Sequence, residues 1–232
     1  RTYYPKLCLI QLAMPSDQEN SAVLIDPLEG HLDLAPLYEL FLNTDIVKVF
    51  HAARQDLEIF FHDKNIIPNP IFDTQLAAMV CGFGEQVGYE TLVRSICKVN
   101  LDKSSRFTDW SLRPLSNNQQ QYALADVTHL RQIYEYLKEQ LKRNERETWL
   151  EEELNTLKNP ETYITRPNEA WKRIKSRSSS SKFLGIVARL AEFRETYAQK
   201  NNIPRNRVFK DNALIELASL KPKSFDDLSR SR

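Results

Sequence analysis

The sequence predicts an α/β domain followed by a smaller all-helical unit, and three features support this. The first is the order strand, strand, helix, strand over residues 7–50. The second is an amphipathic helix over residues 116–141. The third is charge: residues 1–140 carry 12 Lys and Arg against 18 Asp and Glu, whereas residues 141–232 carry 20 against 13. Net charges of −6 and +7 therefore separate the two parts, and a polyanionic partner is the simplest explanation for the basic part.

Composition limits the class of protein. With 232 residues and 41% hydrophobic content, the chain can build one full core and a smaller domain. It has neither a membrane-length apolar run nor a signal peptide, so we expect a cytoplasmic monomer with no membrane partner. Cys8, Cys81 and Cys97 are odd in number and lack the close pairing of zinc ligands, which predicts reduced thiols.

The first strands and helix follow from local patterns. Residues 7–12 and 22–25 should form an antiparallel hairpin around the polar turn 15–21. Leucines from position 32 onward predict a short helix that ends near Asn43. The β-branched run at residues 46–50 then predicts a buried strand.

A strand-to-helix junction follows at His51 to Asp56, and open α/β sheets bind ligands at such junctions. Asp56 lies in the opening turns of the helix, beside apolar residues. It either serves chemistry or opposes the helix dipole. For His51 we favour a satisfied histidine at a strand end over a substrate contact. Asp73 is expected to cap the next helix, which should stop at Gly82, and capping alone explains that residue.

The helix predicted over residues 116–141 carries a carboxylate on its core-facing side. A capping box formed by Ser116 and Gln119 marks its start. Asp126 falls in one arc with Tyr122 and with Leu130, Ile133, Leu137 and Leu141. Because an unpaired buried carboxylate is costly, Asp126 either binds a cation such as a metal ion or leans out to water near the helix start.

Two further stretches carry basic side chains. A helix is expected over residues 89–99, and the loop 100–114 after it is basic and aromatic, with Lys103, Arg106, Trp110 and Arg113. This composition suits contact with a strand of nucleic acid, so Lys103 and Arg106 are candidate substrate-binding residues together with His51.

Several ordered motifs together resemble the ribonuclease D branch of the DEDD family of 3′-to-5′ exonucleases, in its subgroup with a tyrosine in the third motif. The matching stretches are Tyr4-Pro5-x-Leu7-Cys8-Leu9-Ile10-Gln11, His51 to Asp56, Phe72-Asp73-Thr74-Gln75, Leu101-Asp102-Lys103-Ser104 and Tyr122-x-x-x-Asp126. These motifs occur in matching order, and the similarity as a whole covers nearly the whole chain. The resemblance implies an RNase H-like α/β domain and two divalent ions, Mg²⁺ or Mn²⁺, held by four acidic residues.

Carried over residue by residue, the resemblance makes Asp56 and Asp126 metal ligands and Tyr122 the residue that orients or helps to deprotonate the attacking water. These three are the candidate catalytic residues. The family's first motif, Asp-x-Glu on the first strand, is expected just before Arg1. We therefore expect the chain to be part of a longer protein and residues 1–232 alone to be poorly soluble and inactive.

The C-terminal part also resembles a known module. We assign residues 1–145 to the exonuclease domain and residues 146–181 to a helical linker with a serine-rich joint. Residues 182–232 resemble an incomplete HRDC domain, a helical bundle that binds nucleic acid in some members. Residues 172–210 hold 11 basic side chains against two acidic ones, although a merely soluble surface would look similar.

The resemblance thus predicts a 3′-to-5′ exoribonuclease that trims tRNA precursors and other small structured RNAs. Two alternatives remain open: a 3′-to-5′ DNA exonuclease, and a noncatalytic RNA-binding protein on the same fold. Retention of Tyr122, Asp56 and Asp126 favours an enzyme.

Overall fold

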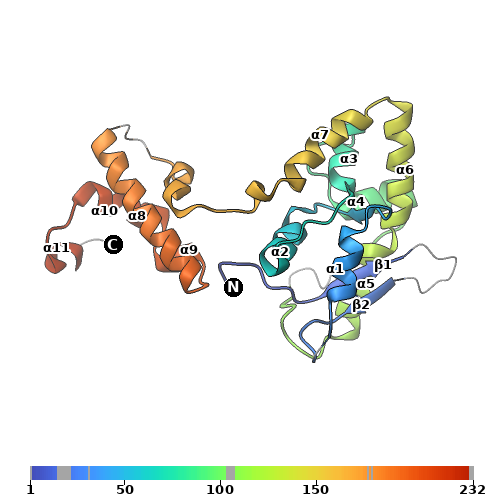
Figure 1. The fold of residues 1–232 in the computed structure, drawn as a ribbon, viewed down its shortest axis with the longest axis horizontal. Helices are drawn as coiled ribbons and strands as arrows, with labels where there is room; N and C mark the ends of the chain where they lie inside the picture. The colour runs from blue at the N-terminus through green and yellow to red at the C-terminus, as the bar shows by residue number, and fades with distance from the viewer. Residues whose placement is uncertain are drawn as a thin grey trace. The chain divides into compact units, whose positions relative to one another are not determined.

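The computed structural model describes residues 2–14, 22–30, 32–102, 108–176, 178 and 180–229. The chain divides into two compact units, shown in Figure 1: Leu7–Thr162, and Arg1–Lys6 with Tyr163–Arg232. The division between Thr162 and Tyr163 lies within the stretch assigned to the linker. The turn predicted at residues 15–21 lies outside the described residues.

Leu7–Thr162 is the α/β unit. Its elements are β1 (Ile10–Ala13), β2 (Ala22–Ile25), α1 (Ala35–Leu42), β3 (Lys48–Phe50), α2 (Arg54–Lys64), β4 (Ile71–Asp73), α3 (Thr74–Val80), α4 (Tyr89–Leu92), the π-helical η1 (Val93–Cys97), α5 (Asn117–Thr128), α6 (Leu130–Arg143), α7 (Glu147–Lys158) and the 3₁₀ turn η2 (Pro160–Thr162). Strands β1 and β2 pair antiparallel, with Ile10 opposite Ile25, which confirms the predicted hairpin. Strands β3 and β4 pair in parallel, with Phe50 opposite Asp73. Parallel pairing places the ends of both strands, and the turns after them, side by side.

Strand β3 is shorter and more polar than the β-branched run predicted. Ile46 and Val47 are each 42% exposed, so the predicted buried strand is wrong at its first two residues. Lys48 is buried instead, and its ammonium donates to three backbone carbonyl oxygens at 2.6–2.8 Å. Those three acceptors compensate for the removal of the charge from water.

The helix predicted over residues 116–141 is in fact two helices, α5 and α6. The capping box is confirmed, because the Gln119 amide donates to Ser116 Oγ and the Ser116 amide donates to Gln119 Oε1. The helical path stops at His129, which has φ −99° and ψ −2°. Beyond the break, Ile133, Leu137 and Leu141 are buried as predicted. The apolar row of α6 therefore does not continue unbroken through Asp126.

Two other helical boundaries depart from expectation. The helix expected over residues 89–99 becomes π-helical after Leu92 and ends at Lys98, which has a left-handed φ of 60°. Glu145 has a left-handed φ of 55°, and it separates α6 from α7. Helix α7 packs on α3 and β4, so part of the assigned linker belongs to the α/β unit.

The second unit is helical, as predicted. Its elements are η3 (Pro167–Arg173), α8 (Ser181–Lys200), α9 (Arg205–Val208), α10 (Asp211–Leu220) and α11 (Phe225–Ser229). Its core joins Ala170, Ile174, Val187, Ala191, Leu214 and Ala218, with Trp171 packed against them. Tyr197 on α8 lies outside this core and is 46% exposed.

The segment Arg1–Lys6 joins this unit through Tyr3. The Tyr3 hydroxyl donates to the carboxylate of Glu195, which is completely buried, and Arg205 lies 3.1 Å from the same carboxylate. The backbone amides of Tyr3 and Tyr4 both donate to Asn202 Oδ1 at 3.1 Å.

Candidate active site

Asp73 fixes the two turns that follow the parallel strands. Its carboxylate accepts from the amides of Gln75 and Leu76 at 2.7 and 3.4 Å, which confirms the predicted helix cap. It also accepts from the amides of Ala52 and Ala53, at 3.1 and 2.8 Å, in the turn before α2. This second pair was not predicted, because only the pairing of β3 with β4 brings the turns together. Asp73 therefore holds in place the start of the helix that carries Asp56.

Asp56 lies in the first turn of α2. Its side chain is solvent-exposed, yet the protein crowded around it and, secondarily, the carboxylate of Asp73 raise the pKa of Asp56 to about 6. Both the exposure of the Asp56 side chain and its raised pKa are explained if solvent reaches the carboxyl from one side while protein surrounds it on the others. Such a carboxyl is accessible to a ligand and poorly compensated without one.

His51 lies at the end of β3, beside the same turn. Its Nδ1 is 2.9 Å from Thr74 Oγ1, and that hydroxyl donates to the Phe50 carbonyl oxygen at 3.0 Å. The His51 imidazole is thus linked through Thr74 to the end of β3, and it also has a backbone hydrogen bond with Val87. Burial lowers the His51 pKa, with the Asp73 carboxylate opposing. This geometry is that of the satisfied histidine; the substrate contact stays a prediction.

Asp126 and Tyr122 lie on α5, one turn apart, and both are half-buried. Burial raises the pKa of the Asp126 carboxyl to about 6. The ring of Tyr122 lies against that of Trp110, with centroids 6.1 Å apart. The predicted placement of an aspartate and a phenol on successive turns of one helix is therefore present.

Tyr89 connects the region of Asp126 to the region of His51. Its hydroxyl donates to the Ala125 carbonyl oxygen at 3.0 Å and accepts from the His129 amide at 3.2 Å. Its ring lies 5.6 Å from the His51 ring. The sequence identified Tyr89 only as the start of a helix, and nothing in the local pattern pointed to a contact with residues 125–129.

The donor set suits a divalent cation. Within the described part of the chain, neither Asp56 nor Asp126 forms an ion pair or accepts a hydrogen bond, and the raised pKa of each reflects that lack of compensation. Hard divalent ions take carboxylate oxygens, and binding one would offset the cost of enclosing these groups. The described residues contain no cluster of three or more His, Cys, Asp or Glu placed to share an ion.

The basic loop contributes less than the sequence suggested. Lys103 and Arg106 lie outside the described residues. Arg113, which we had placed among the nucleic-acid contacts, instead forms an ion pair with Asp26 and donates to the Cys8 carbonyl oxygen at 2.7 Å. Its guanidinium ties this loop to the β1–β2 hairpin, so the expectation for Arg113 was wrong.

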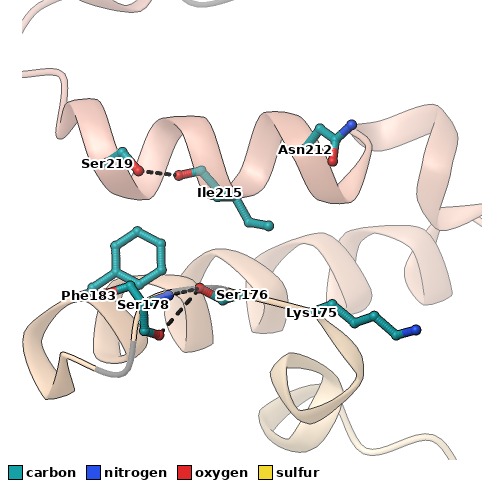
Figure 2. Close-up of a pocket in the computed structure, with 7 residues that line it drawn as sticks. All are labelled: Lys175, Ser176, Ser178, Phe183, Asn212, Ile215 and Ser219. Carbon is teal, nitrogen blue, oxygen red and sulfur yellow. Dashed lines mark hydrogen bonds between the residues drawn. The ribbon is translucent and has the colours of Figure 1, made fainter.

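Neither of the two main cavities in the described residues is lined by the candidate catalytic residues. One, of about 370 Å³, lies beside Arg146 and Trp149. The other, of about 490 Å³, lies in the helical unit and is shown in Figure 2; its walls are Lys175, Ser176, Ser178, Phe183, Asn212, Ile215 and Ser219.

No described helix is both long enough and apolar enough to cross a membrane.

Known protein families match both parts of the chain. Residues 1–142 match the family model described as 3′-5′ exonuclease, and residues 183–232 match that of the HRDC domain. The chain is 64% identical to ribonuclease D of Jannaschia over 232 residues and 48% identical to ribonuclease D of Bartonella henselae over 231 residues. It covers 60% and 56% of those two proteins, while all of this chain is aligned.

Solved structures agree with the fold. The structure of Escherichia coli RNase D, described as an exoribonuclease involved in structured RNA processing, superposes with a TM-score of 0.87 at 32% identity, over 99% of this chain and 60% of that one. Brucella melitensis NrnC with bound Mg²⁺ shares the fold with a TM-score of 0.59 at 24% identity, over 75% of this chain and 83% of that one.

These matches confirm an RNase H-like exonuclease domain followed by a helical HRDC domain. The chain spans about 60% of the length of the curated relatives it matches. It belongs to the ribonuclease D family, whose members join a metal-dependent 3′-5′ exonuclease domain to an HRDC domain.

Proposed function

We propose that this chain carries the catalytic residues of a 3′-to-5′ exoribonuclease. The observation that supports this most is the contrast among three aspartates. Asp73 accepts hydrogen bonds from four backbone amides, whereas Asp56 and Asp126 have raised pKa values and no protein partner among the described residues. Uncompensated carboxylates of this kind are expected where a cation binds.

In this proposal Asp56 and Asp126 hold divalent ions, two in number, together with acidic residues beyond these two. When bound, such ions supply activation of a water and stabilisation of the leaving 3′ oxygen in an in-line displacement at phosphorus. Tyr122, one turn before Asp126, orients the attacking water and shares its proton through the phenol oxygen. Exposure of Asp56 leaves room for the 3′ end of a strand.

We infer RNA rather than DNA as the substrate from the family, and tRNA precursors and other small structured RNAs as the substrate class. The name of the E. coli relative supports that class. A noncatalytic RNA-binding protein would not need Asp56 and Asp126 to bind a cation. The raised pKa values of these two carboxyls therefore favour the catalytic alternative.

The helical unit would add affinity for the RNA backbone, and the cavity of Figure 2 is the place we propose for contact. Lys175 is exposed, without an acidic partner in the described chain, and it can approach a phosphate. Phe183 faces α10 across the cavity, where a base could stack on its ring, and Asn212 offers an amide donor and acceptor.

That contact is tested by Lys175→Ala in the full-length protein, with Lys200→Ala at the exposed end of α8 as control. Loss of one phosphate contact should flatten the slope of log K against log salt by about 0.7 for a single strand. Equal slopes for both variants and the parent would mean that Lys175 does not meet RNA.

The catalytic proposal is tested by Asp126→Asn in the full-length protein, with trimming of a 3′-labelled RNA as the assay. We expect metal-dependent trimming to be abolished while circular dichroism and the melting temperature stay at the parent values or above, because the substituted amide carries no charge to enclose. Asp45→Asn removes an exposed carboxylate from the same unit and should trim normally. A folded Asp126→Asn protein that trims at the parent rate would exclude the proposed site.

A further inference from the structure

We propose that Tyr89 is a positioning residue for Asp126, which it places by inserting its hydroxyl into the backbone hydrogen bonds between α5 and α6. This inference rests on the proposed function, because it concerns the aspartate proposed to bind metal. No motif of the sequence points to Tyr89, and the residue makes its contacts through its hydroxyl and ring to elements distant in sequence.

The hydroxyl stands where a helical hydrogen bond would otherwise form. In a continuous α-helix the amide of residue 129 donates to the carbonyl oxygen of residue 125. Here the His129 amide donates to the Tyr89 oxygen at 3.2 Å, and the Tyr89 hydroxyl donates to the Ala125 oxygen at 3.0 Å. A side chain inserted in this way is a known cause of helix breaks. It gives a physical reason for the boundary at His129.

Asp126 lies inside the turn that the hydroxyl holds open. The residues on either side of the insertion are Ala125, directly before Asp126, and His129, three residues after it. Helix α6 is anchored by the buried side chains Ile133, Leu137 and Leu141. If the direct bond from His129 to Ala125 formed, α5 would have to turn relative to that anchored helix, and the Asp126 carboxylate would move with it.

Tyr89 also reaches the strand end that leads to Asp56. Its ring lies against the ring of His51, which is held through Thr74 to the Phe50 carbonyl oxygen. The π-helical segment that follows α4 begins four residues after Tyr89, and π-helical turns are frequent beside functional sites. One side chain therefore touches both the turn that carries Asp126 and the strand end before Asp56.

The decisive variant is Tyr89→Phe in the full-length protein, because phenylalanine keeps the ring and removes only the hydroxyl. Tyr38→Phe is the matched control: Tyr38 is a buried tyrosine of the same unit whose hydroxyl donates to Asp63 Oδ2 at 2.5 Å. Mn²⁺ binding is measured by electron paramagnetic resonance, and trimming kinetics are measured on a 3′-labelled RNA.

For Tyr89→Phe we expect the Mn²⁺ Kd to rise about 10-fold, the size typical for loss of a group that orients a metal ligand. We expect kcat to fall about 10²-fold, as for an ångström-scale misplacement, with KM within about twofold of the parent. Tyr38→Phe should lower the melting temperature without changing either quantity. Equal Mn²⁺ binding and kcat in Tyr89→Phe and the parent would overturn the positioning role.

Asp126→Asn is measured in the same series, so that the two proposals can fail separately. If Asp126→Asn weakens Mn²⁺ binding and Tyr89→Phe does not, the inference about Tyr89 is wrong and the proposed function stands. If Asp126→Asn leaves Mn²⁺ binding unchanged, the proposed function is wrong. Should Tyr89→Phe fail to fold, NMR of the unmodified protein decides: a nuclear Overhauser effect between the His129 amide proton and the Tyr89 ring protons supports the insertion, and its absence overturns it.

Discussion

Replacing Asp73 should separate its two structural roles, the capping of α3 and the tie to the turn before α2. The residue is 2% exposed, and its carboxylate accepts three hydrogen bonds of 2.7–3.1 Å and a fourth of 3.4 Å. Each bond to a charged group contributes about 1.5–3 kcal/mol net, and the contributions of neighbours do not add. We expect Asp73→Ala to cost about 4 kcal/mol, near the upper end for single substitutions.

Asp73→Ser is the sharper variant, because serine is a good N-cap and can still accept from the amides at the start of α3. It cannot also reach the amides of Ala52 and Ala53, which are then left without their acceptor. We expect a loss of about 2–3 kcal/mol, which corresponds to roughly 4–12 °C in melting temperature for a unit of this size. Asp33→Ser, at the exposed start of α1, where Asp33 accepts from the Ala35 amide at 2.9 Å, is the control and should cost under about 1 kcal/mol.

Both variants are measured by urea and thermal unfolding of the full-length protein, and the ionisation of Asp56 is followed by carboxyl-carbon NMR. Because the Asp73 carboxylate contributes to the raised pKa of Asp56, the Asp56 pKa should fall in Asp73→Ser. A loss of stability no larger than that of Asp33→Ser, with an unchanged Asp56 pKa, would refute the idea that Asp73 holds the two turns together.

Three further predictions concern the site and its support. Tyr122→Phe should lower kcat by about 10² to 10⁴ with unchanged RNA affinity, and unchanged kinetics would restrict Tyr122 to packing. Because the folded-state pKa values of Asp56 and Asp126 are raised from 3.8 to about 6, their contribution to metal-free stability should be full below about pH 4 and lost as pH rises through 6. Mn²⁺ binding should strengthen over that same rise, because the carboxylates must be ionised, and titration calorimetry from pH 5 to 7.5 would show a flat profile if they are not the ligands. Arg113→Ala should cost about 1–2 kcal/mol in urea unfolding, because it removes a partly buried ion pair with Asp26 and the bond to the Cys8 carbonyl oxygen, and a loss below about 0.5 kcal/mol would make the pair a surface contact.

Local patterns predicted those elements whose boundaries depend on short-range chemistry. The capping box at Ser116 and the cap at Asp73 rest on side chains bonding amides two or three residues away, and both are present. The helix α10, Asp211–Leu220, buries Leu214 and Ala218 one turn apart, a spacing that is likewise local. The candidate residues Asp56, Asp126 and Tyr122 were likewise identified from position within a helix and from motif order.

Boundaries set by partners distant in sequence could not be predicted in this way. The break at His129 depends on the Tyr89 hydroxyl, 40 residues earlier in the chain. The helical periodicity of the sequence continues across residue 129 and therefore does not indicate the break. Arg113 looked like a free basic residue because its partner, Asp26, is 87 positions away. The burial of Lys48 depends partly on such a partner, because the Asn69 carbonyl oxygen lies 21 positions away, whereas the Asn43 and Ile46 oxygens belong to the turn just before β3.

The same distinction decides which aspartates are available for chemistry. Sequence alone places Asp56, Asp73 and Asp126 in comparable settings, each in or beside the first turns of a helix. The Asp73 carboxylate accepts from four amides in two turns, three of them at Oδ1 and one at Oδ2, so its charge is already compensated by the protein and a metal ion at these oxygens would compete with the bonds that hold the turns. Asp56 and Asp126 accept no hydrogen bond from the described residues, and burial raises the pKa of each carboxyl to about 6, so a bound cation would favour their ionised forms. By holding the turn before α2, Asp73 lets its neighbour Asp56 remain both fixed in place and uncompensated.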